Sequence, residues 1–297
     1  MIENLTKYLE EFDYSEEHKS FFIENMKTLI ACDAAKKALT EHIESYKNGE
    51  LNWEAIGADA VKYANLTSIH EYTAKFLFYT ALIPYSYHYF EEKGLGYTEW
   101  YDSMIDFKWK VIECVKCYGV IGVFVDWFES FFTADRVTFG RLQFNLVDAD
   151  YDYKTFQFDI KKGEKLVTVH IPTDSRTPFT KENREAAYKR AATHFSKVLG
   201  TNEVIFRCGT WLLNPVHRDI LPEKSNIKSF LDDFELDLDS FKPDGGSSVW
   251  RIFYVRPYNG DADSLPEETS LMRIYKKFIK DGGITGTAVG FRKERVN

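Results

Sequence analysis

The sequence predicts a protein of the α+β class, in which an all-helical N-terminal domain precedes a mixed α/β domain. Up to about residue 135, apolar residues recur at helical spacing and almost no strand pattern interrupts them. From Arg141 to Leu146 polar and apolar residues instead alternate strictly, as they do in a strand with one buried face. We therefore expect two domains, residues 1–134 and residues 135–297.

Signals for the start and end of helices divide the first domain. Ser15 is a good N-cap residue, Gly49 suits a C-cap, and Pro84 cannot continue a helix without a kink. The last helix is apolar on most sides, so we expect it at the centre of the domain, with Gly119 or Gly122 as its breaking point. The expected helices cover residues 16–30, 33–46, 67–82 and 98–132.

The second domain alternates between strand and helix signals. Hairpin strands come first, and helices then alternate with further strands, which predicts a mixed sheet covered by helices. Thr180 can cap one helix and Gly200 can end it. We expect the acidic run 232–239 and the loop 242–248 to be flexible. The expected strands are 141–146, 155–160, 166–171, 204–211, 249–255 and 284–291, and the helices are 180–199, parts of 212–234, and 270–280.

Composition and charge argue against several classes of protein. The net charge of -8, without a Lys/Arg-rich run, argues against a nucleic-acid partner, because phosphate binding needs a basic face. The apolar stretch 115–132 contains Lys116, Asp126 and Glu129, so we expect no membrane span. Four cysteines without a signal-peptide pattern at the N-terminus predict reduced thiols in the cytoplasm.

Short stretches along most of the chain resemble, in order, a bacterial family of two-domain acyltransferases. That family has a helical N-terminal domain and a C-terminal domain similar to the GNAT fold of N-acetyltransferases. The stretches are FKWK at 107–110, EC at 113–114, GRLQF at 140–144, VHIP at 169–172, CGTWLL at 208–213, LP at 221–222, SNI at 225–227, LP at 265–266 and TSL at 269–271. The resemblance implies a GNAT-like mixed α/β domain in the second half.

The resemblance also implies an acyl-CoA donor, acetyl-CoA or a longer one, and an amine of a small molecule or peptide as acceptor. In GNAT folds CoA lies where two central parallel strands separate, with its pyrophosphate on the loop and helix that follow the first strand. Here that strand is 166–171 and the loop is 173–179. A helix N-terminus with free backbone N–H groups binds phosphate without basic side chains. The implied cofactor-binding residues are Thr173, Ser175, Arg176, Thr177 and Thr180.

The loop departs from the glycine-rich pattern that is typical of GNAT folds. Glycine lets the backbone approach phosphate closely, whereas this chain has Thr173-Asp174-Ser175-Arg176-Thr177. Asp174 adds a negative charge beside the expected phosphate, and Arg176 can offset it. The alternative hypothesis is therefore a catalytically silent GNAT-like ligand-binding module.

Two residues are candidates for proton transfer. His170, at the end of the strand that borders the expected acyl site, can act as the general base towards the acceptor amine, or it can be a hydrogen-bonded structural histidine. Cys208 can return a proton to the CoA thiolate, or it can be a small buried hydrophobic residue in phase with Val204 and Phe206.

Five further residues are candidates for acceptor binding. Arg141 and Gln143 lie on the polar face of the first strand, which can line a cleft or face water. Arg141 suits a carboxylate of the acceptor or a structural ion pair. Trp211 can stack on substrate or close the core, and Ser225 and Asn226 can contact a ligand or cap a helix.

Cys114 and Cys117 form a C-x-x-C pattern inside an expected helix. Zinc needs about four ligands, and no second Cys/His pair is near in sequence, so we expect no metal site. The pair is either two core thiols or, in a third functional hypothesis, a redox-sensitive element.

Overall fold

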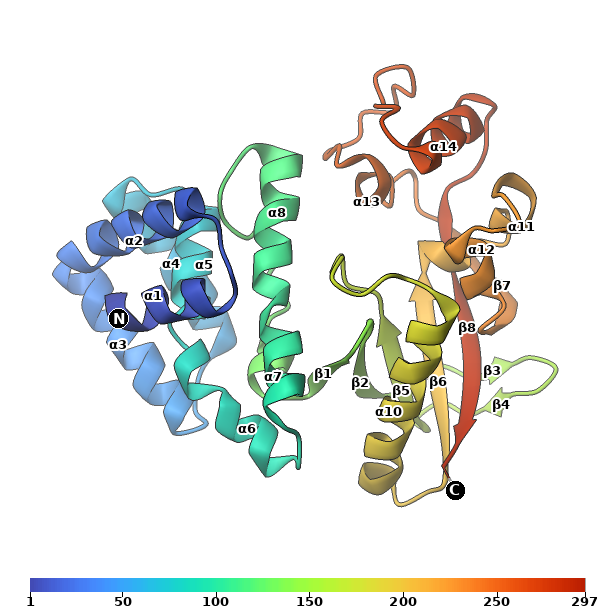
Figure 1. Ribbon diagram of the computed structural model, residues 1–297, viewed down its shortest axis with the longest axis horizontal. Coiled ribbons are helices and arrows are strands. Elements are labelled where there is room, and N and C mark those ends of the chain that lie inside the picture. The colour runs from blue at the N-terminus through green and yellow to red at the C-terminus, as the bar shows by residue number, and fades with distance from the viewer. Residues whose placement is uncertain (297) are drawn as a thin grey trace. The chain divides into compact units, whose positions relative to one another are not determined.

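A computed structural model describes residues 1–296, and the chain folds into two compact units, Met1–Val137 and Thr138–Asn297. The division falls close to the boundary expected at residues 134 and 135. The first unit is helical up to Arg136, where strand β1 begins, and the chain from there onward forms a mixed α/β domain, which confirms the predicted fold class (Figure 1). In residues 1–296, no helix combines the length and apolar character needed to cross a membrane.

Aromatic side chains fill the core of the helical unit. Phe22 stacks on Phe76 and Phe107 on Phe128, each pair with ring centroids 3.8 Å apart. The helices are α1 (Ile2–Glu11), α2 (Glu16–Ala31), α3 (Asp33–Lys47), α4 (Trp53–Thr67), α5 (Glu71–Thr80), the 3-10 turn η1 (Ile83–Tyr85), α6 (Tyr87–Glu92), α7 (Tyr97–Met104), α8 (Asp106–Tyr118) and α9 (Glu129–Phe132).

The chain does not form one continuous helix over 98–132 but α7, α8 and α9, and one of the two expected breaking points, Gly119, is confirmed. Gly119 ends α8 with a left-handed C-cap, at φ 68°. Gly122 then passes so close to the backbone of α5 that a Cβ atom would lie 2.4 Å from the carbonyl carbon of Tyr72. The helix expected at 67–82 is α5, which starts only at Glu71. Residue 67 is instead the last residue of α4, a helix that was not predicted.

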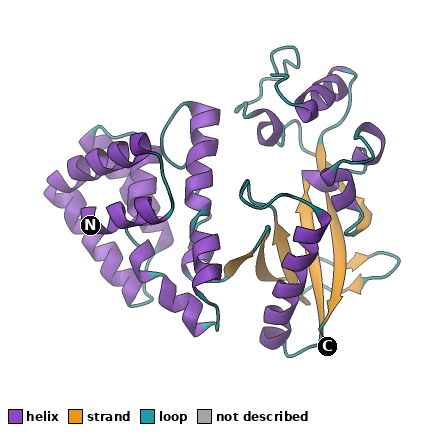
Figure 2. Ribbon diagram, viewed as in Figure 1, coloured by secondary structure: helices purple, strands orange, loops and turns teal. Residues whose placement is uncertain are grey.

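The second unit is built on a six-stranded mixed sheet in the order β1-β2-β5-β6-β8-β7. Figure 2 shows its strands in orange. Strands β5 and β6 pair in parallel, whereas the β2–β5, β6–β8 and β7–β8 pairs are antiparallel. The elements are β1 (Arg136–Phe139), β2 (Leu142–Asp148), β3 (Tyr153–Lys154), β4 (Asp159–Ile160), β5 (Lys165–His170), α10 (Lys181–Leu199), β6 (Glu203–Thr210), the 3-10 turn η2 (Trp211–Leu213), α11 (His217–Ile220), α12 (Asn226–Leu231), β7 (Glu235–Pro243), α13 (Trp250–Phe253), α14 (Ser270–Lys280) and β8 (Gly286–Arg295).

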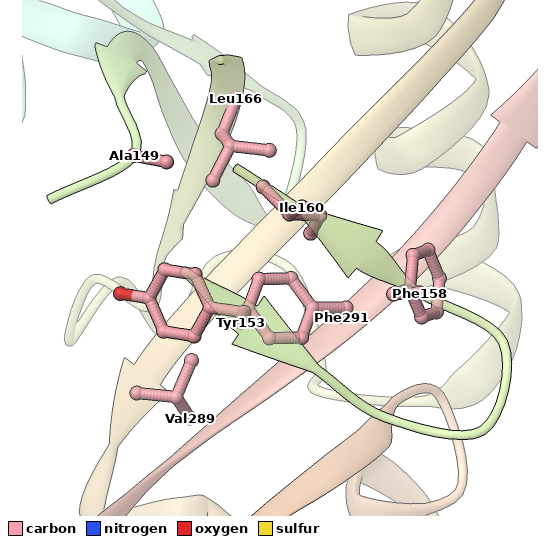
Figure 3. Close-up of a cluster of buried hydrophobic side chains, with 7 residues drawn as sticks. All are labelled: Ala149, Tyr153, Phe158, Ile160, Leu166, Val289 and Phe291. Atoms are coloured by element: carbon pink, nitrogen blue, oxygen red, sulfur yellow. The ribbon is translucent and has the colours of Figure 1, made fainter. Parts of the chain in front are cut away.

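The two faces of this sheet have different covers. Helix α10 covers one face, where Tyr188 packs against Phe144 of β2 and Phe206 of β6, with ring centroids 6.3 and 5.7 Å away. Because side chains along a strand alternate between the two faces of the sheet, Leu166 of β5 points to the face that α10 does not cover. There the β3–β4 hairpin builds a second buried cluster, shown in Figure 3, from Ala149, Tyr153, Phe158, Ile160, Leu166, Val289 and Phe291.

Three expectations for the second unit are wrong. The strand expected at 155–160 is instead a bend between β3 and β4, and only Asp159 and Ile160 of that range are in a strand. The acidic run expected to be flexible contains β7, an edge strand paired with β8 and irregular between Asp237 and Lys242. Its carboxylates are tolerated because one side of an edge strand faces water, and charge there blocks pairing with other chains. The strand expected at 249–255 is instead the single turn α13, ended by Tyr254 in the left-handed region at φ 57°.

We expect Gly122→Ala to destabilise the helical unit by about 1–3 kcal/mol, because the added Cβ must push the Tyr72 and Thr73 backbone aside. Denaturant unfolding measures the change. Gly57→Ala is the matched control. Its Cβ would meet only the Tyr79 hydroxyl oxygen at 3.5 Å inside α4, so we expect no loss, or a gain of about 0.5–1 kcal/mol. Equal effects of the two substitutions would contradict the prediction.

Candidate functional site

The two parallel strands in the middle of the sheet separate before they end. They pair only at Val167 with Phe206 and at Thr168 with Arg207. Beyond these positions β5 runs on to His170 and β6 to Thr210, each still paired along its other edge, with Gln143 and Ala288. The facing backbone edges therefore have no strand partner in the described residues, and such groups need another partner. A gap of this kind at the carboxyl end of parallel strands is a common place for a ligand.

The loop that leaves β5 leads directly into a long, capped helix. Thr180 caps α10, since its hydroxyl oxygen accepts a hydrogen bond from the Asn183 N–H at 3.4 Å. The Asn183 amide in turn donates to the Pro178 carbonyl at 2.9 Å. Glu182 sits in the first turn. Its carboxylate accepts hydrogen bonds from its own N–H and from the Thr180 hydroxyl, which lowers its pKa. A negatively charged side chain thus occupies the helix end that the resemblance assigns to phosphate.

Asp174, the acidic residue of the loop, is buried and neutralised. Its carboxylate accepts hydrogen bonds from Arg176, at 2.8 Å from the backbone N–H, 2.9 Å from Nε and 2.6 Å from Nη2. The Asp174 side chain is 6% exposed and that of Arg176 is 34% exposed. The loop therefore holds its shape through a local ion pair rather than through glycines.

A second buried ion pair fixes the end of the loop. Arg184 of α10 is fully buried. It forms an ion pair with Asp233 through two hydrogen bonds, from Nε to Oδ2 at 2.5 Å and from Nη2 to Oδ1 at 3.1 Å. The same guanidinium donates to the Phe179 carbonyl at 3.0 Å and to the Ser229 hydroxyl at 3.1 Å. One side chain thus joins the loop, α10 and α12.

His170 lies at the end of β5, half-buried, on the face that carries Gln143 and Asn145 of β2. Its Nε2 is 2.6 Å from the Asn145 Oδ1. Since an amide oxygen only accepts, Nε2 carries the proton in this pairing. The hydroxyl of Thr168, on the same face, is buried without a hydrogen-bond partner among residues 1–296.

Cys208 points to the opposite face, towards α10. It is fully buried, and its thiol donates to the Val169 carbonyl at 3.4 Å, across the separation of the two strands. Burial raises the pKa of this thiol well above its ordinary value. The thiol is therefore a weak acid in this structure.

The residues predicted to bind the acceptor lie at three places in the second unit. Arg141 and Gln143 are buried and lie beside His170, at the loop end of β2. Trp211 instead begins η2 and packs edge-on against His217 and Tyr275.

Ser225 and Asn226 stand apart from His170, at the start of α12. The Ser225 hydroxyl caps this helix by accepting from the N–H groups of Ile227 and Lys228, and Asn226 is exposed. Capping occupies the Ser225 hydroxyl oxygen, which agrees with the structural alternative for this residue.

A buried histidine–tyrosine pair packs against Trp211 and was not predicted from the sequence. His217 donates from Nδ1 to the Leu212 carbonyl at 3.0 Å, and its Nε2 is hydrogen-bonded to the Tyr275 hydroxyl. Both side chains are buried. Burial lowers the pKa of His217 to about 4. No local signal reveals the pair, because the two residues are 58 positions apart and one of them lies in a four-residue helix.

Cys114 and Cys117 lie one turn apart on α8, and both are free thiols. Cys114 is fully buried, and this burial raises its pKa to about 12. Thiolate is the reactive form of cysteine, so Cys114 reacts slowly with oxidants. In the described part of the chain, no three His, Cys, Asp or Glu side chains converge on a possible metal position.

The matching family model is that of the GNAT-like C-terminal domain, over residues 137–292, and the chain belongs to this family. A comparison with curated proteins finds no match. Among solved structures, one acyltransferase in complex with decanoyl-CoA and teicoplanin is 19% identical, with a TM-score of 0.72 over 97% of this chain and 87% of that chain.

Two further structures have the same fold. A mutant acyltransferase in complex with octanoyl-CoA is 19% identical, with a TM-score of 0.72 over 98% of this chain and 88% of the other. An acyltransferase in complex with CoA and 10C-teicoplanin is 20% identical, with a TM-score of 0.66 over 82% of this chain and 77% of the other. These likenesses extend over both units of the chain.

The depressed pKa of His217 predicts a stability that falls in mild acid. The unfolded chain takes up a proton near pH 6.5 and the folded protein only near pH 4, so unfolding is favoured as the pH falls between these values. From pH 6.5 to pH 5 we expect a loss of about 2 kcal/mol from this residue. Denaturant unfolding at a series of pH values measures it.

His217→Asn is the control, since asparagine can keep the donor to Leu212 but does not titrate. It should flatten the dependence of stability on pH between 5 and 6.5. An unchanged slope in this variant would show that other groups control the acid response.

Proposed function

We propose that this protein is an acyl-CoA-dependent N-acyltransferase of the GNAT type, acting on an amine of a small molecule or peptide. The observation that carries the proposal is the separation of β5 and β6 directly before a loop and a capped helix, inside a GNAT-like domain. The ligands of the similar structures support it, since these acyltransferases were solved with CoA, octanoyl-CoA or decanoyl-CoA. The proposed donor is acetyl-CoA or a longer acyl-CoA.

The residues of the site fit such a donor. Beyond the two paired positions, the facing edges of β5 and β6 have no strand partner within residues 1–296 and offer backbone groups to an extended amide-containing arm. We place the phosphates at Thr173, Ser175, Arg176, Thr177 and Thr180, where the Asp174 charge is already neutralised. Phosphate at the N-terminus of α10 would compete with the Glu182 carboxylate, so this side chain must turn away on binding.

In the proposed reaction His170 is the general base. Its Nδ1 accepts a proton from the acceptor amine as the nitrogen attacks the thioester carbonyl, and the Asn145 oxygen holds the ring through Nε2. The thiolate that leaves then takes up a proton. The general-acid role predicted for Cys208 stays a hypothesis. The raised pKa of its thiol argues against this role, because the thiol gives up its proton less readily. We propose that Cys208 instead supports the separated strands through Val169.

Two observations favour a second candidate function, a catalytically silent ligand-binding module. The loop holds its shape through Asp174 and Arg176 rather than through glycines, and Glu182 occupies the end of α10. Such a module would bind a ligand in the same gap without turnover.

We also propose a cytoplasmic location for the protein. The support comes from its cysteines, since Cys32, Cys114, Cys117 and Cys208 are all free thiols. Free thiols are typical of reducing compartments, in which disulfides are rare.

Calorimetric titration with acetyl-CoA, octanoyl-CoA and decanoyl-CoA tests the proposal, and we expect at least one of them to bind. Glu182→Gln should bind about two- to fivefold tighter, because it removes a carboxylate that competes for the helix N-terminus. Glu24→Gln, on an exposed position of α2, should leave the affinity unchanged. No binding of any acyl-CoA to either the wild type or Glu182→Gln would refute both the enzyme and a CoA-binding silent module.

His170→Gln separates the enzyme from the silent module. We expect the affinity for acyl-CoA to stay within about twofold while kcat falls by about 10²- to 10⁴-fold, the usual contribution of a general base. His18→Gln, on α2, should keep the wild-type rate. Release of free CoA in the presence of a panel of amines reports turnover. An unchanged kcat would remove His170 from the mechanism, and wild-type binding without any turnover would favour the silent module.

A further inference from the structure

Arg141 is a buried cation without an anionic partner. The residue is 9% exposed, and its one hydrogen bond within residues 1–296 runs from Nη1 to the neutral Pro172 carbonyl at 2.8 Å. Its Nε is buried and has no acceptor among these residues. Buried charges are normally paired or bind a ligand, because leaving water is costly for an ion.

The neighbouring arginines show what Arg141 lacks. Arg176 uses its Nε and Nη2 edge to hold Asp174, and Arg184 uses the same edge to hold Asp233. In Arg141 this edge has no acceptor in the described chain, although Nη1 and the ring of Phe179 fix the guanidinium. Within residues 1–296, Asp174 and Asp233 are thus paired with Arg176 and Arg184, whereas no carboxylate is hydrogen-bonded to Arg141.

The orientation of this free edge is set before any ligand arrives. The Cζ atoms of Arg141 and Arg184 each lie 5.0 Å from the centroid of the Phe179 ring. The ion pair with Asp233 holds Arg184 in place. The Phe179 ring packed on Arg184 is therefore well positioned to orient the Arg141 guanidinium. Burial lowers the pKa of Arg141 to about 10, and the charge of Asp174 acts in the opposite direction. At neutral pH the group stays charged, so an anion can bind it.

The position of Arg141 places the free edge within the proposed active site. In the β2–β5 ladder Gln143 lies opposite His170, so Arg141 lies two residues further along, beside Pro172 at the start of the loop. The free edge is therefore close both to the proposed base and to the proposed phosphate loop. Nothing else in this part of the described chain supplies a carboxylate to it.

We propose that Arg141 forms an oxyanion subsite whose Nε and Nη2 bind two oxygens of one anionic group of a substrate. This inference rests on the proposed acyl transfer and adds to it a chemical requirement for the ligand. The planar fork of arginine matches carboxylate and phosphate and binds them with two parallel hydrogen bonds. The anion is a carboxylate of the acceptor or a phosphate of the acyl-CoA.

The experiment compares wild type with Arg141→Gln, Arg141→Lys and the control Arg218→Gln, whose arginine is half-exposed and paired with Asp232. One arm measures the affinity for acyl-CoA and for the matching S-acyl-pantetheine, which has no pyrophosphate. The other arm measures KM for amino acids and for the amines that lack their carboxylate. Arg141→Lys keeps the charge but not the fork, so it tests geometry even where Arg141→Gln does not fold.

A phosphate ligand should make both Arg141 variants bind acyl-CoA about tenfold to a hundredfold more weakly, with little change for the pantetheine ester. A carboxylate ligand should raise KM by a similar factor for the amino acids alone, with kcat little changed. Either result supports the subsite. If Arg141→Lys equals wild type with every ligand, Arg141 is structural and the inference is overturned.

Inorganic pyrophosphate and acetate separate this inference from the proposed function. Both anions are titrated against wild type and Arg141→Lys by thermal shift. Stabilisation that depends on Arg141, in a protein that binds no acyl-CoA, would keep the subsite and reject the transferase. Binding of acyl-CoA that is equal in all variants, without any effect of Arg141 on anions or acceptors, would reject the subsite and keep the transferase.

Discussion

The buried ion pair between Arg184 and Asp233 holds together the part of the structure on which the proposed site depends. Two charges out of water are stable only because each has its partner and further hydrogen bonds, here to the Phe179 carbonyl and the Ser229 hydroxyl. Removing one partner of such a pair typically costs about 3–5 kcal/mol. The pair fixes the start of α10, the end of the loop and α12, so it determines what surrounds the gap between β5 and β6.

Arginine–carboxylate pairs take over the role that glycines have in a typical GNAT loop. A glycine-rich loop wraps phosphate with its backbone, whereas this loop is held by Asp174 on Arg176 and by Phe179 on Arg184. Of the three arginines near this loop, Arg176 is partly exposed and Arg184 is fully buried, while the buried Nε of Arg141 has no acceptor within residues 1–296. Specific recognition can therefore come from side chains.

Local patterns predicted the parts of the structure that depend on neighbours in sequence. Helix α10 begins after Thr180 and ends before Gly200, as expected. The alternation of polar and apolar residues correctly predicted strands β2 and β5. Predictions failed where distant segments decide. Edge strand β7 pairs with β8, which lies more than 40 residues further along the chain for most of its positions, so its own acidic sequence does not reveal the strand. The loop and His170 were assigned to the candidate site from the sequence and stay predictions, whereas no local pattern predicted the His217–Tyr275 pair.

The sequence by itself determined that a helical half precedes an α/β half, and that a strand, a loop and a capped helix follow one another at residues 165–199. These features arise from periodicity and capping within a few residues. Only the tertiary structure decided that β5 and β6 separate after two paired positions, that Asp233 neutralises Arg184 from 49 residues away, and that Arg141 receives no carboxylate. Pairing and burial of charges depend on which distant segments meet, and no local pattern records that.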